Sequence, residues 1–481
     1  MNPQIGQTED FRPLTIMWFR QDLRLRDNPA LCAAAAGGRV LPVYVLDDGN
    51  AGEWKMGGAS RWWLHDSLAR LNESLHGGLW VLRGDAGREL AGLCASLPVG
   101  KVVWNRCYEP WRRERDGRIK RALGEAGVEA ASFNGALLLE PWENTKADGT
   151  PYRVFTPFYH SLLSSHQAVA PLPQPRNLAI ADCSQPADRI GQLGLKPRIP
   201  WDAGLAERWR PGEAAALARW RDFLENSAGT YQARRDFPAE SAASGLSPHL
   251  HFGEIGPRQI WWDIHSLAGG DGSHPFARQL CWREFAHHLM YHDLRITREN
   301  WRGEFDDFPW REDAESLRRW QQGSTGIPMV DAGMRELWAT GTMHNRARMV
   351  TGSFLTKNLL IHWRRGADWF WDCLVDADLA NNSFGWQWVA GSGADAAPYF
   401  RIFNPVLQSR KFDPQGAYLR RWLPALRDLP EKHIHAPWEA PESVLRAAGI
   451  RLGEDYPLPI VDLRMSRERA LGAWQTLRRG L

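Results

Sequence analysis

The stretch Asp376–Trp388, which reads DADLANNSFGWQW, is the part of the chain around which we expect the rest to be organised. It opens with two carboxylates two residues apart and then carries two Asn, one Ser, one Gln and two Trp, with no further charged side chain before Asp395. Indole rings offer stacking area and amides offer hydrogen bonds, so the stretch predicts a lining for a flat aromatic guest with polar edges. The alternative is a Trp-rich turn of the core, because most large aromatic side chains serve packing. The composition indicates a loop rather than one face of a helix.

Length and composition indicate a globular protein of more than one domain. The chain has 481 residues, of which 43% are hydrophobic and 24% charged. The first dozen residues lack the apolar segment of a secretory signal, and no apolar run approaches the roughly 20 residues of a membrane helix. We therefore expect a cytoplasmic protein with no membrane partner. No C-x-x-C pair is present, which predicts free thiols and no metal site for the six cysteines, Cys32, Cys94, Cys107, Cys183, Cys281 and Cys373.

The charge pattern gives one hint of a nucleic-acid partner. A net charge of +3 is too small to indicate such binding by itself. Between Met343 and Arg365, however, the chain has no acidic residue, and this predicts a basic stripe that could face phosphates, although most charge runs are solvated helix faces. The basic residues of this stripe are Arg346, Arg348, Lys357, Arg364 and Arg365. The 26 Trp residues indicate stacking or electron transfer in addition to core packing.

Periodicity divides the chain into three parts. Residues 13–134 alternate short apolar runs with helical patterns, which predicts an α/β domain with a parallel, Rossmann-like sheet. Ligands of such sheets bind beyond the carboxyl ends of strands, which draws attention to Asn105 and Glu109, although ordinary loop polarity would also explain both. Residues 135–205 are irregular and proline-rich and predict a connector. Residues 206–481 read as one helix after another, which predicts a larger all-α domain.

Two apparent signals carry little weight. The segment Gly391–Ala396 matches the dinucleotide-binding fingerprint, but no strand-and-helix unit surrounds it and Pro398 stands where the helix would begin. His287 and His288 are neighbours on a predicted helix, where adjacent side chains diverge by about 100° and cannot share a metal. No phosphate-loop signature is present.

Two segments combine residue types that suit a ligand with a phosphate and an aromatic ring. Small hydroxylated residues beside Gly in Ser244–Ser247 leave backbone amides accessible and predict an anion nest that could take a diphosphate. On a predicted helix, Gln279, Trp282 and Arg283 share one face at i, i+3 and i+4 and present an amide, a ring and a cation.

A further segment, Met343–Met349, predicts a helix that faces the acidic stretch. Asn345, Arg348 and Met349 share one face of this helix. Arg348 could neutralise Asp376.

Taken together and in order along the chain, these segments resemble the photolyase/cryptochrome family, and in motif they are most similar to its enzymes for cyclobutane pyrimidine dimers. The likeness covers nearly the whole chain. The segments that carry it are WFRQDLR at Trp18–Arg24, SGLSP at Ser244–Pro248, WREF at Trp282–Phe285, NRARM at Asn345–Met349, the stretch Asp376–Trp388, and YFRIFNP at Tyr399–Pro405.

The resemblance implies that the helical domain holds FAD in a bent shape. Asn382 would face the flavin N5, and Trp386, Trp363 and Trp310 match a chain of tryptophans that reduces the flavin by light-driven electron hopping. For Trp363, core packing is an equally good explanation. The other cofactor contacts that the resemblance implies are Tyr231, Ala243, Ser244, Gly245, Leu246, Ser247, Gln279, Trp282, Arg283, Asn345, Arg348, Asp376, Ala377 and Asp378.

The resemblance also implies a monomeric carbon–carbon lyase that acts on UV-damaged DNA. Excited, reduced FAD would donate an electron to the dimer, the strained ring would open, and the electron would return. Extruding a poorly stacked dimer costs only a few kcal/mol. The substrate contacts implied are Arg235, Gln279, Trp282, Asn345, Arg346, Met349, Trp388 and Gln408.

Two residues depart from this family pattern. Gln279 stands where dimer-repairing members usually have Glu and resembles enzymes for (6-4) photoproducts, but those use two His where this chain has Asn345 and Met349. Ala243 replaces a usual Thr, which costs about 1 kcal/mol of hydrogen bonding. A cryptochrome, a light receptor without repair, is the alternative, although the chain closes with a predicted helix over 466–479 rather than a long tail.

The resemblance further implies an antenna chromophore in the α/β domain. Asn105 and Glu109 resemble the positions that bind a folate antenna in relatives, and Glu109 could accept from a pterin amino group. We expect 5,10-methenyltetrahydrofolate, with 8-hydroxy-5-deazaflavin as the alternative.

Overall fold

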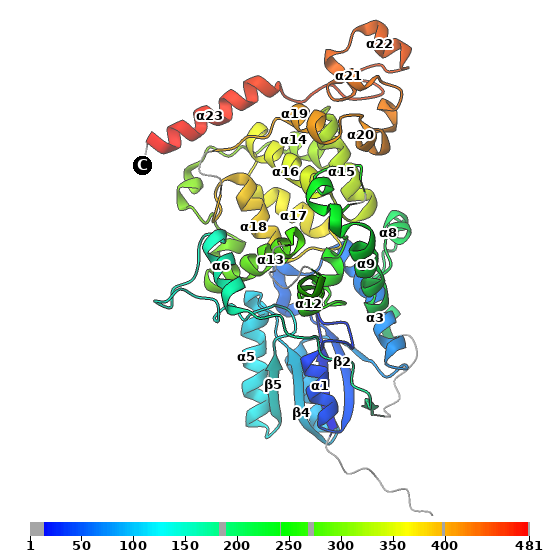
Figure 1. Ribbon diagram of the computed structural model, residues 1–481, viewed down its shortest axis with the longest axis vertical. Helices are drawn as coiled ribbons and strands as arrows, with labels where there is room; N and C mark the ends of the chain where they lie inside the picture. Colours follow the sequence, from blue (N-terminus) through cyan, green and yellow to red (C-terminus); the bar gives the residue numbers. More distant parts are fainter. Residues whose placement is uncertain (1–13, 182–188, 241, 268–273, 397–399, 480–481) are drawn as a thin grey trace, which may run out of the picture.

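The computed structural model describes residues 14–181, 189–240, 242–267, 274–396 and 400–479. Three residues used in the sequence analysis, Cys183, Pro398 and Tyr399, lie outside these ranges. Figure 1 shows an α/β part at one end of the molecule and a larger helical part above it. The predicted fold class, a parallel α/β domain followed by a larger all-α domain, is confirmed.

The α/β part is built on a sheet whose described strands all pair in parallel, in the order β3-β2-β1-β4-β5. The central strand β1 is buried along its whole length, as expected where helices cover both faces. Strand β6, from the segment predicted as a connector, pairs with the start of β2, so this segment contributes to the sheet. The strands are β1 (Leu14–Phe19), β2 (Arg39–Leu46), β3 (Trp80–Arg83), β4 (Val99–Asn105), β5 (Glu129–Phe133) and β6 (Ala179–Ile180).

Alternation along β1 divides the α/β core between the two faces of the sheet. Successive side chains of a strand point to opposite faces. Met17 and Phe19 therefore pack in one cluster together with Trp63, while Ile16 and Trp18 pack in another on the opposite face. The helices of this part are α1 (Pro29–Ala36), α2 (Asp48–Ala51), α3 (Gly58–Ser74), α4 (Ala86–Ser96) and α5 (Pro110–Glu125).

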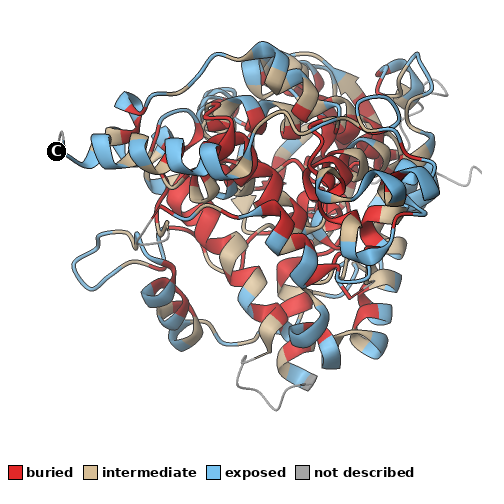
Figure 2. Ribbon diagram, turned by 90° about the horizontal axis from the view of Figure 1, so that it is seen from above, coloured by how far each residue is buried: buried red, intermediate tan, exposed pale blue. Residues whose placement is uncertain are grey.

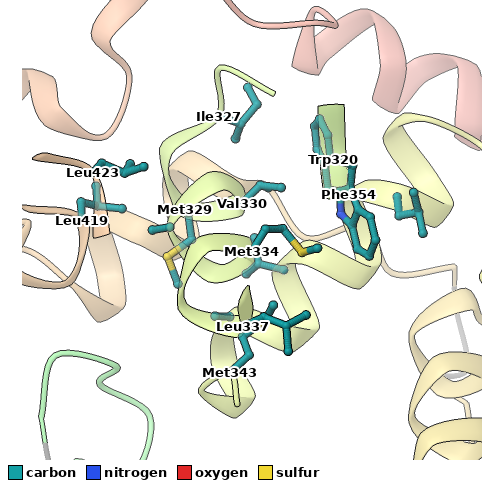
Figure 3. Packing of buried hydrophobic residues seen from close by; sticks show 14 of the residues in the cluster. Trp320, Ile327, Met329, Val330, Met334, Leu337, Met343, Phe354, Leu419 and Leu423 are labelled. Carbon is teal, nitrogen blue, oxygen red and sulfur yellow. The ribbon is translucent and has the colours of Figure 1, made fainter. Parts of the chain in front are cut away.

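The helical part contains two large apolar cores. One surrounds α15, where Val330, Met334 and Leu337 lie among side chains of neighbouring elements (Figure 3). Figure 2 shows that buried residues gather in the interior and exposed ones at the periphery. The helices are α6 (Phe155–Ser165), α7 (Arg189–Gln192), α8 (Ala203–Arg208), α9 (Glu213–Asn226), α10 (Tyr231–Arg234), α11 (Ser247–His251), α12 (Pro257–Leu267), α13 (Pro275–His292), α14 (Ala314–Gln321), α15 (Pro328–Thr340), α16 (Asn345–Ser353), α17 (Trp363–Cys373), α18 (Leu379–Ala390), α19 (Pro405–Phe412), α20 (Ala417–Trp422), α21 (Glu431–Ile434), α22 (Glu442–Ala447) and α23 (Leu463–Arg479).

The stretch predicted as a loop is mostly a helix, so that prediction was wrong. Helix α18 begins directly after Asp378, whose side chain accepts a hydrogen bond from the backbone N–H of Asn381. It ends at Gly391, which has a left-handed conformation with φ 85°. Asp before the first turn and Gly after the last are the residues preferred at these positions. The two caps and burial against other helices outweigh the low helix propensity of Asn, Ser and Gly.

Lys357 is fully buried and has no acidic partner among the described residues. It lies in a π-helical turn, Phe354–Asn358, that follows α16. Its Nζ donates to the backbone carbonyl of Ala390, at the end of α18, and lies 3.5 Å from the ring centroid of Phe400. Lys357, which the sequence analysis assigns to a basic stripe, therefore stabilises the end of α18, and its buried amine cannot contact phosphates.

We expect Lys357→Met to change the pH dependence of stability. Burial lowers the pKa of Lys357 well below its usual range. The unfolded chain therefore binds one proton more than the folded chain between the folded pKa and about pH 10, and stability rises with pH there by up to about 1.4 kcal/mol per pH unit. Chemical denaturation across this range should show a smaller slope for Lys357→Met. Lys432→Met, at an exposed lysine, serves as the control and should keep the wild-type slope; an unchanged slope in Lys357→Met would contradict this account.

Candidate functional site

Helix α18 occupies the centre of the helical part and packs against α13, α16 and α17 (Figure 1). These helices carry most of the predicted substrate contacts and several of the predicted cofactor contacts. The two carboxylates that precede α18 are largely buried, so each needs a partner.

Asp376 is the meeting point of segments that lie far apart in the sequence. The guanidinium of Arg348 lies 3.2 Å from its Oδ2, which confirms the predicted ion pair. The Ser247 hydroxyl donates to the same oxygen at 2.5 Å. A further hydrogen bond, from Arg348 Nε to the Met343 carbonyl, fixes the guanidinium. The predicted anion turn and the predicted helix face therefore meet at one carboxylate.

Asp378 is held by two histidines as well as by its role as helix cap. Its Oδ2 lies 3.8 Å from His251 Nδ1 and 3.5 Å from His287 Nε2. Burial opposes the charged carboxylate, but the histidines outweigh it and hold the pKa of Asp378 well below its usual range. Asp378 is therefore an anion at neutral pH.

The turn Ser244–Ser247 contains a glycine in the left-handed conformation, and its role as an anion nest stays a prediction. Gly245 has φ 64°, and a Cβ there would lie 2.8 Å from Arg219 Nη1, so the position requires glycine. The backbone N–H of Leu246 donates to Ser244 Oγ at 3.3 Å. Helix α11 starts at the end of this turn.

Gln279, Trp282 and Arg283 lie on α13 as predicted, but two of them are already engaged within the protein. The Trp282 ring stacks on Phe155 with centroids 3.4 Å apart. Arg283 donates from Nη1 to the Ala136 carbonyl at 2.8 Å, in the segment predicted as connector. Phe384, from α18, also stacks on Trp282, with ring centroids 5.8 Å apart, so the three rings form one aromatic cluster.

Of the three tryptophans of the predicted electron chain, Trp310 is the most exposed. Trp386 and Trp363 are buried, and Trp310 is half-buried. The ring of His362 lies between the last two, 5.5 Å from Trp363 and 5.0 Å from Trp310. Beside Trp386, one turn earlier on α18, Asn382 donates from Nδ2 to the Ala367 carbonyl at 3.1 Å.

The predicted DNA contacts differ in their exposure and in whether they already have a partner within the protein. Arg346 forms an ion pair with Asp236 at 2.7 Å and lies over the Phe412 ring at 4.0 Å, so its charge is used within the protein. Asn345 is exposed and Met349 half-buried. The other predicted substrate contacts, Arg235, Gln279, Trp388 and Gln408, are half-buried. Among the other predicted cofactor contacts, Asn382 is half-buried, Ala243 is exposed, and Tyr231 and Ala377 are buried.

The two predicted antenna positions differ in their surroundings. Asn105 is buried, and its amide donates to Asp22 at 2.6 Å and Asn28 at 2.7 Å and accepts from the Ala30 N–H at 3.3 Å. This geometry argues against an antenna contact for Asn105, because its hydrogen-bonding groups serve the α/β core. Glu109 is half-buried in front of α5 and its role stays a prediction.

Comparison with known proteins identifies the family. A family model described as "DNA photolyase" matches residues 15–176, and one described as "FAD binding domain of DNA photolyase" matches residues 276–476. The deoxyribodipyrimidine photo-lyase of Agrobacterium fabrum is 47% identical over 472 residues, which cover 96% of this chain and 98% of the relative. This chain belongs to the DNA photolyase family.

Both photolyases and cryptochromes are similar to this chain over most of its length. The crystal structure of a class III photolyase from Agrobacterium tumefaciens superposes with a TM-score of 0.94 at 45% identity and covers 99% of this chain and 100% of that one. Cryptochrome-2 of Arabidopsis thaliana is 38% identical over 478 residues, which cover 94% of this chain and 77% of the relative.

The described part of the chain contains neither a candidate membrane span nor a candidate metal site. Among the described ranges, no helix is long and apolar enough to cross a membrane. Within these described residues, no group of three or more His, Cys, Asp or Glu side chains is placed to hold a metal ion.

The sequence analysis missed residues that complete the site. His251 and His287 hold Asp378, and His287 entered the analysis only as a discarded metal ligand. Phe155 and Phe384 frame Trp282. No local pattern identifies these four, because each acts on a partner distant in the sequence or on another helix.

We expect Gly366→Ala to disturb the environment of Trp386. A Cβ at Gly366 would lie 2.1 Å from the Trp386 ring, so the ring or helix α17 must move, at a cost of about 1 to 3 kcal/mol. Gly385→Ala is the matched control, because it lies on α18 with nothing within 4 Å of its Cβ, and it should be neutral or stabilising by about 0.5 to 1 kcal/mol. Denaturant unfolding of both variants checks this expectation. Equal effects of the two substitutions would contradict the close packing of Trp386.

Proposed function

We propose that this protein repairs cyclobutane pyrimidine dimers in DNA by light-driven electron transfer from excited, reduced FAD. The observation that carries the proposal is the near full-length similarity to a deoxyribodipyrimidine photo-lyase, together with a site in which Ser247, Arg348 and Asp376 converge as the family resemblance implies. The matched family model for the helical part is named for FAD binding.

The residues present fit a flavin. The turn at Gly245 brings backbone amides to the start of α11, where a diphosphate would be stabilised. Arg348 and Asp376 offer a cation and an anion at fixed positions to the polar edge of a ring system. Asn382 is oriented by its bond to Ala367, and its Oδ1 accepts no hydrogen bond from the described residues, which leaves it available to the flavin N5.

Within this proposal the flavin supplies the electron and the chain supplies position and shielding. Trp388 and Trp282 would lie beside the two linked bases, with one face of the Trp282 ring already covered by Phe155, and Met349 and Asn345 would lie at one edge of the dimer. An extruded dimer needs such a surface because it loses its stacking in the duplex. Arg235 would contact a phosphate, which gives binding that weakens with salt.

We further propose 5,10-methenyltetrahydrofolate as an antenna, with Glu109 as its contact, and 8-hydroxy-5-deazaflavin as the alternative. Glu109 is near the carboxyl end of β4, where ligands of parallel sheets bind. Asn105 is excluded from this part of the proposal by its inward hydrogen bonds. Localisation in the cytoplasm and a monomeric state are likewise proposals.

The second candidate function is a cryptochrome-type light receptor. It is supported by the 38% identity to a plant cryptochrome over nearly the whole chain. Repair of (6-4) photoproducts is less well supported, because no histidine stands at Asn345 or Met349 to supply a proton.

Illumination of a dimer-containing oligonucleotide separates the candidates. With the reduced protein, we expect ultraviolet absorbance to recover as the two pyrimidines of each dimer regain their C5–C6 double bonds, and the signal should saturate when all dimers are split. A dark sample and an oligonucleotide carrying a (6-4) photoproduct are the controls. Absorbance that stays at its starting value under light would refute dimer repair and favour the receptor.

Trp386→Phe should slow the light-driven reduction of the oxidised flavin without preventing repair. Phenylalanine fills the space but oxidises far less readily than indole, so the first electron step is lost, whereas an enzyme reduced chemically no longer needs that step. Flavin absorbance under blue light measures the first effect, and the oligonucleotide assay with pre-reduced enzyme measures the second. A variant that photoreduces at the wild-type rate would show that electrons reach the flavin by another route.

A further inference from the structure

Two buried histidines converge on Asp378, the residue that starts α18. His251 is the last residue of α11, and His287 lies within α13. Their exposed fractions are 8% and 7%. Because the Asp378 side chain caps α18, the groups that orient this carboxylate also set the position of the helix that carries Asn382.

The partners of His287 determine its protonation state. Its Nδ1 lies 3.0 Å from the Arg283 carbonyl, which can only accept a hydrogen bond. Its Nε2 faces the carboxylate of Asp378, which also only accepts while ionised. A neutral imidazole has one donor and one acceptor, so it would direct a lone pair at one of these oxygens. Both nitrogens must therefore be protonated.

His251 has different neighbours. Its Nε2 lies 3.1 Å from the side-chain amide nitrogen of Gln21, and its Nδ1 lies 3.8 Å from Asp378 Oδ2. His251 therefore connects Asp378 to the α/β part, whereas His287 is the partner whose two ring nitrogens both face acceptors.

We propose that His287 is a buried imidazolium that acts as the counter-ion of Asp378 and as a positioning residue for the flavin-facing end of α18. The identity of the ligand rests on the proposed function. Other described groups face His287 without replacing Asp378: His251 across the carboxylate, Arg283 and Glu284 on its own helix, and the Tyr108 ring with its centroid 6.5 Å away.

The sign of the pH dependence follows from the raised pKa of His287. Burial opposes the cation, but Asp378 outweighs it and raises the pKa above the usual value. The stabilisation is therefore fully present below the unfolded-state pKa of about 6.5 and is lost as pH rises through the folded value. Flavin affinity should fall with pH over the same interval.

The test uses three variants of the FAD-loaded protein. His287→Gln keeps a donor but removes the charge, and His287→Lys restores the charge. His288→Gln is the matched control, because His288 is the adjacent buried histidine, faces the Pro141 carbonyl, and has a pKa lowered by burial to about 4. FAD dissociation is followed in the dark by flavin fluorescence between about pH 6 and pH 9.

We expect His287→Gln to weaken FAD binding by roughly tenfold or more at the acidic end and to lose the pH dependence. His287→Lys should bind FAD and move the loss to higher pH, and His288→Gln should follow the wild type. A His287→Gln profile equal to that of the wild type would overturn the proposal.

A direct measurement covers the case in which His287→Gln does not fold. In wild-type protein with ¹⁵N-labelled histidine, the signal of a doubly protonated, buried ring is expected at slightly acidic pH, and only neutral buried rings would overturn the proposal. Neither readout uses repair. A protein with the expected FAD profile that leaves dimers intact under light would contradict the proposed repair and not the role of His287.

Discussion

The helical half of this protein depends on the burial of two carboxylates, Asp376 and Asp378, at the start of one helix. An ionised carboxylate without a partner is too costly to bury, so each must be met by cations and donors from elsewhere in the chain. Asp376 is met by Arg348 and Ser247, and Asp378 by the histidines of α11 and α13. The helices can pack only in the arrangement that brings these groups together, and this arrangement places α18 in the centre.

The opposite end of α18 is fixed by different means. Lys357 donates to the last carbonyl of the helix, and Gly391 provides the left-handed residue that closes it. Between the ends, the Trp386 ring lies so close to Gly366 that no larger residue fits there. A helix held at both ends and along one side keeps Asn382 at a defined position, which its proposed contact with the flavin N5 requires.

The sequence predicted the parallel sheet well because its strands are buried on both faces and read as short apolar runs between helical patterns. It predicted the pair Arg348 and Asp376 from charge alone. It failed for α18, because Asn, Ser and Gly disfavour a helix locally, while the caps and the neighbours that stabilise it act from outside the segment. It also failed for Asn105: a position after a strand is visible in the sequence, but the direction of the side chain depends on Asp22 and Asn28.

The same limit explains why the histidines were missed, and it shows how the two halves of the molecule depend on each other. His251 contacts Gln21, which follows β1, and a Cβ at Gly253 would lie 2.1 Å from the Gln21 carbonyl. The backbone N–H of Leu23 donates to the Phe252 carbonyl at 3.1 Å. The loop after β1 therefore packs tightly against the segment that follows α11. This contact helps to orient His251, the last residue of α11 and one of the two histidines beside Asp378. The contacts of Leu23 with Phe252 and of Gln21 with Gly253 are backbone-to-backbone, and the second leaves no room for a side chain at Gly253. A shift of the α/β half would therefore be transmitted through His251 to the start of α18, so the sheet helps to position this helix without contacting it.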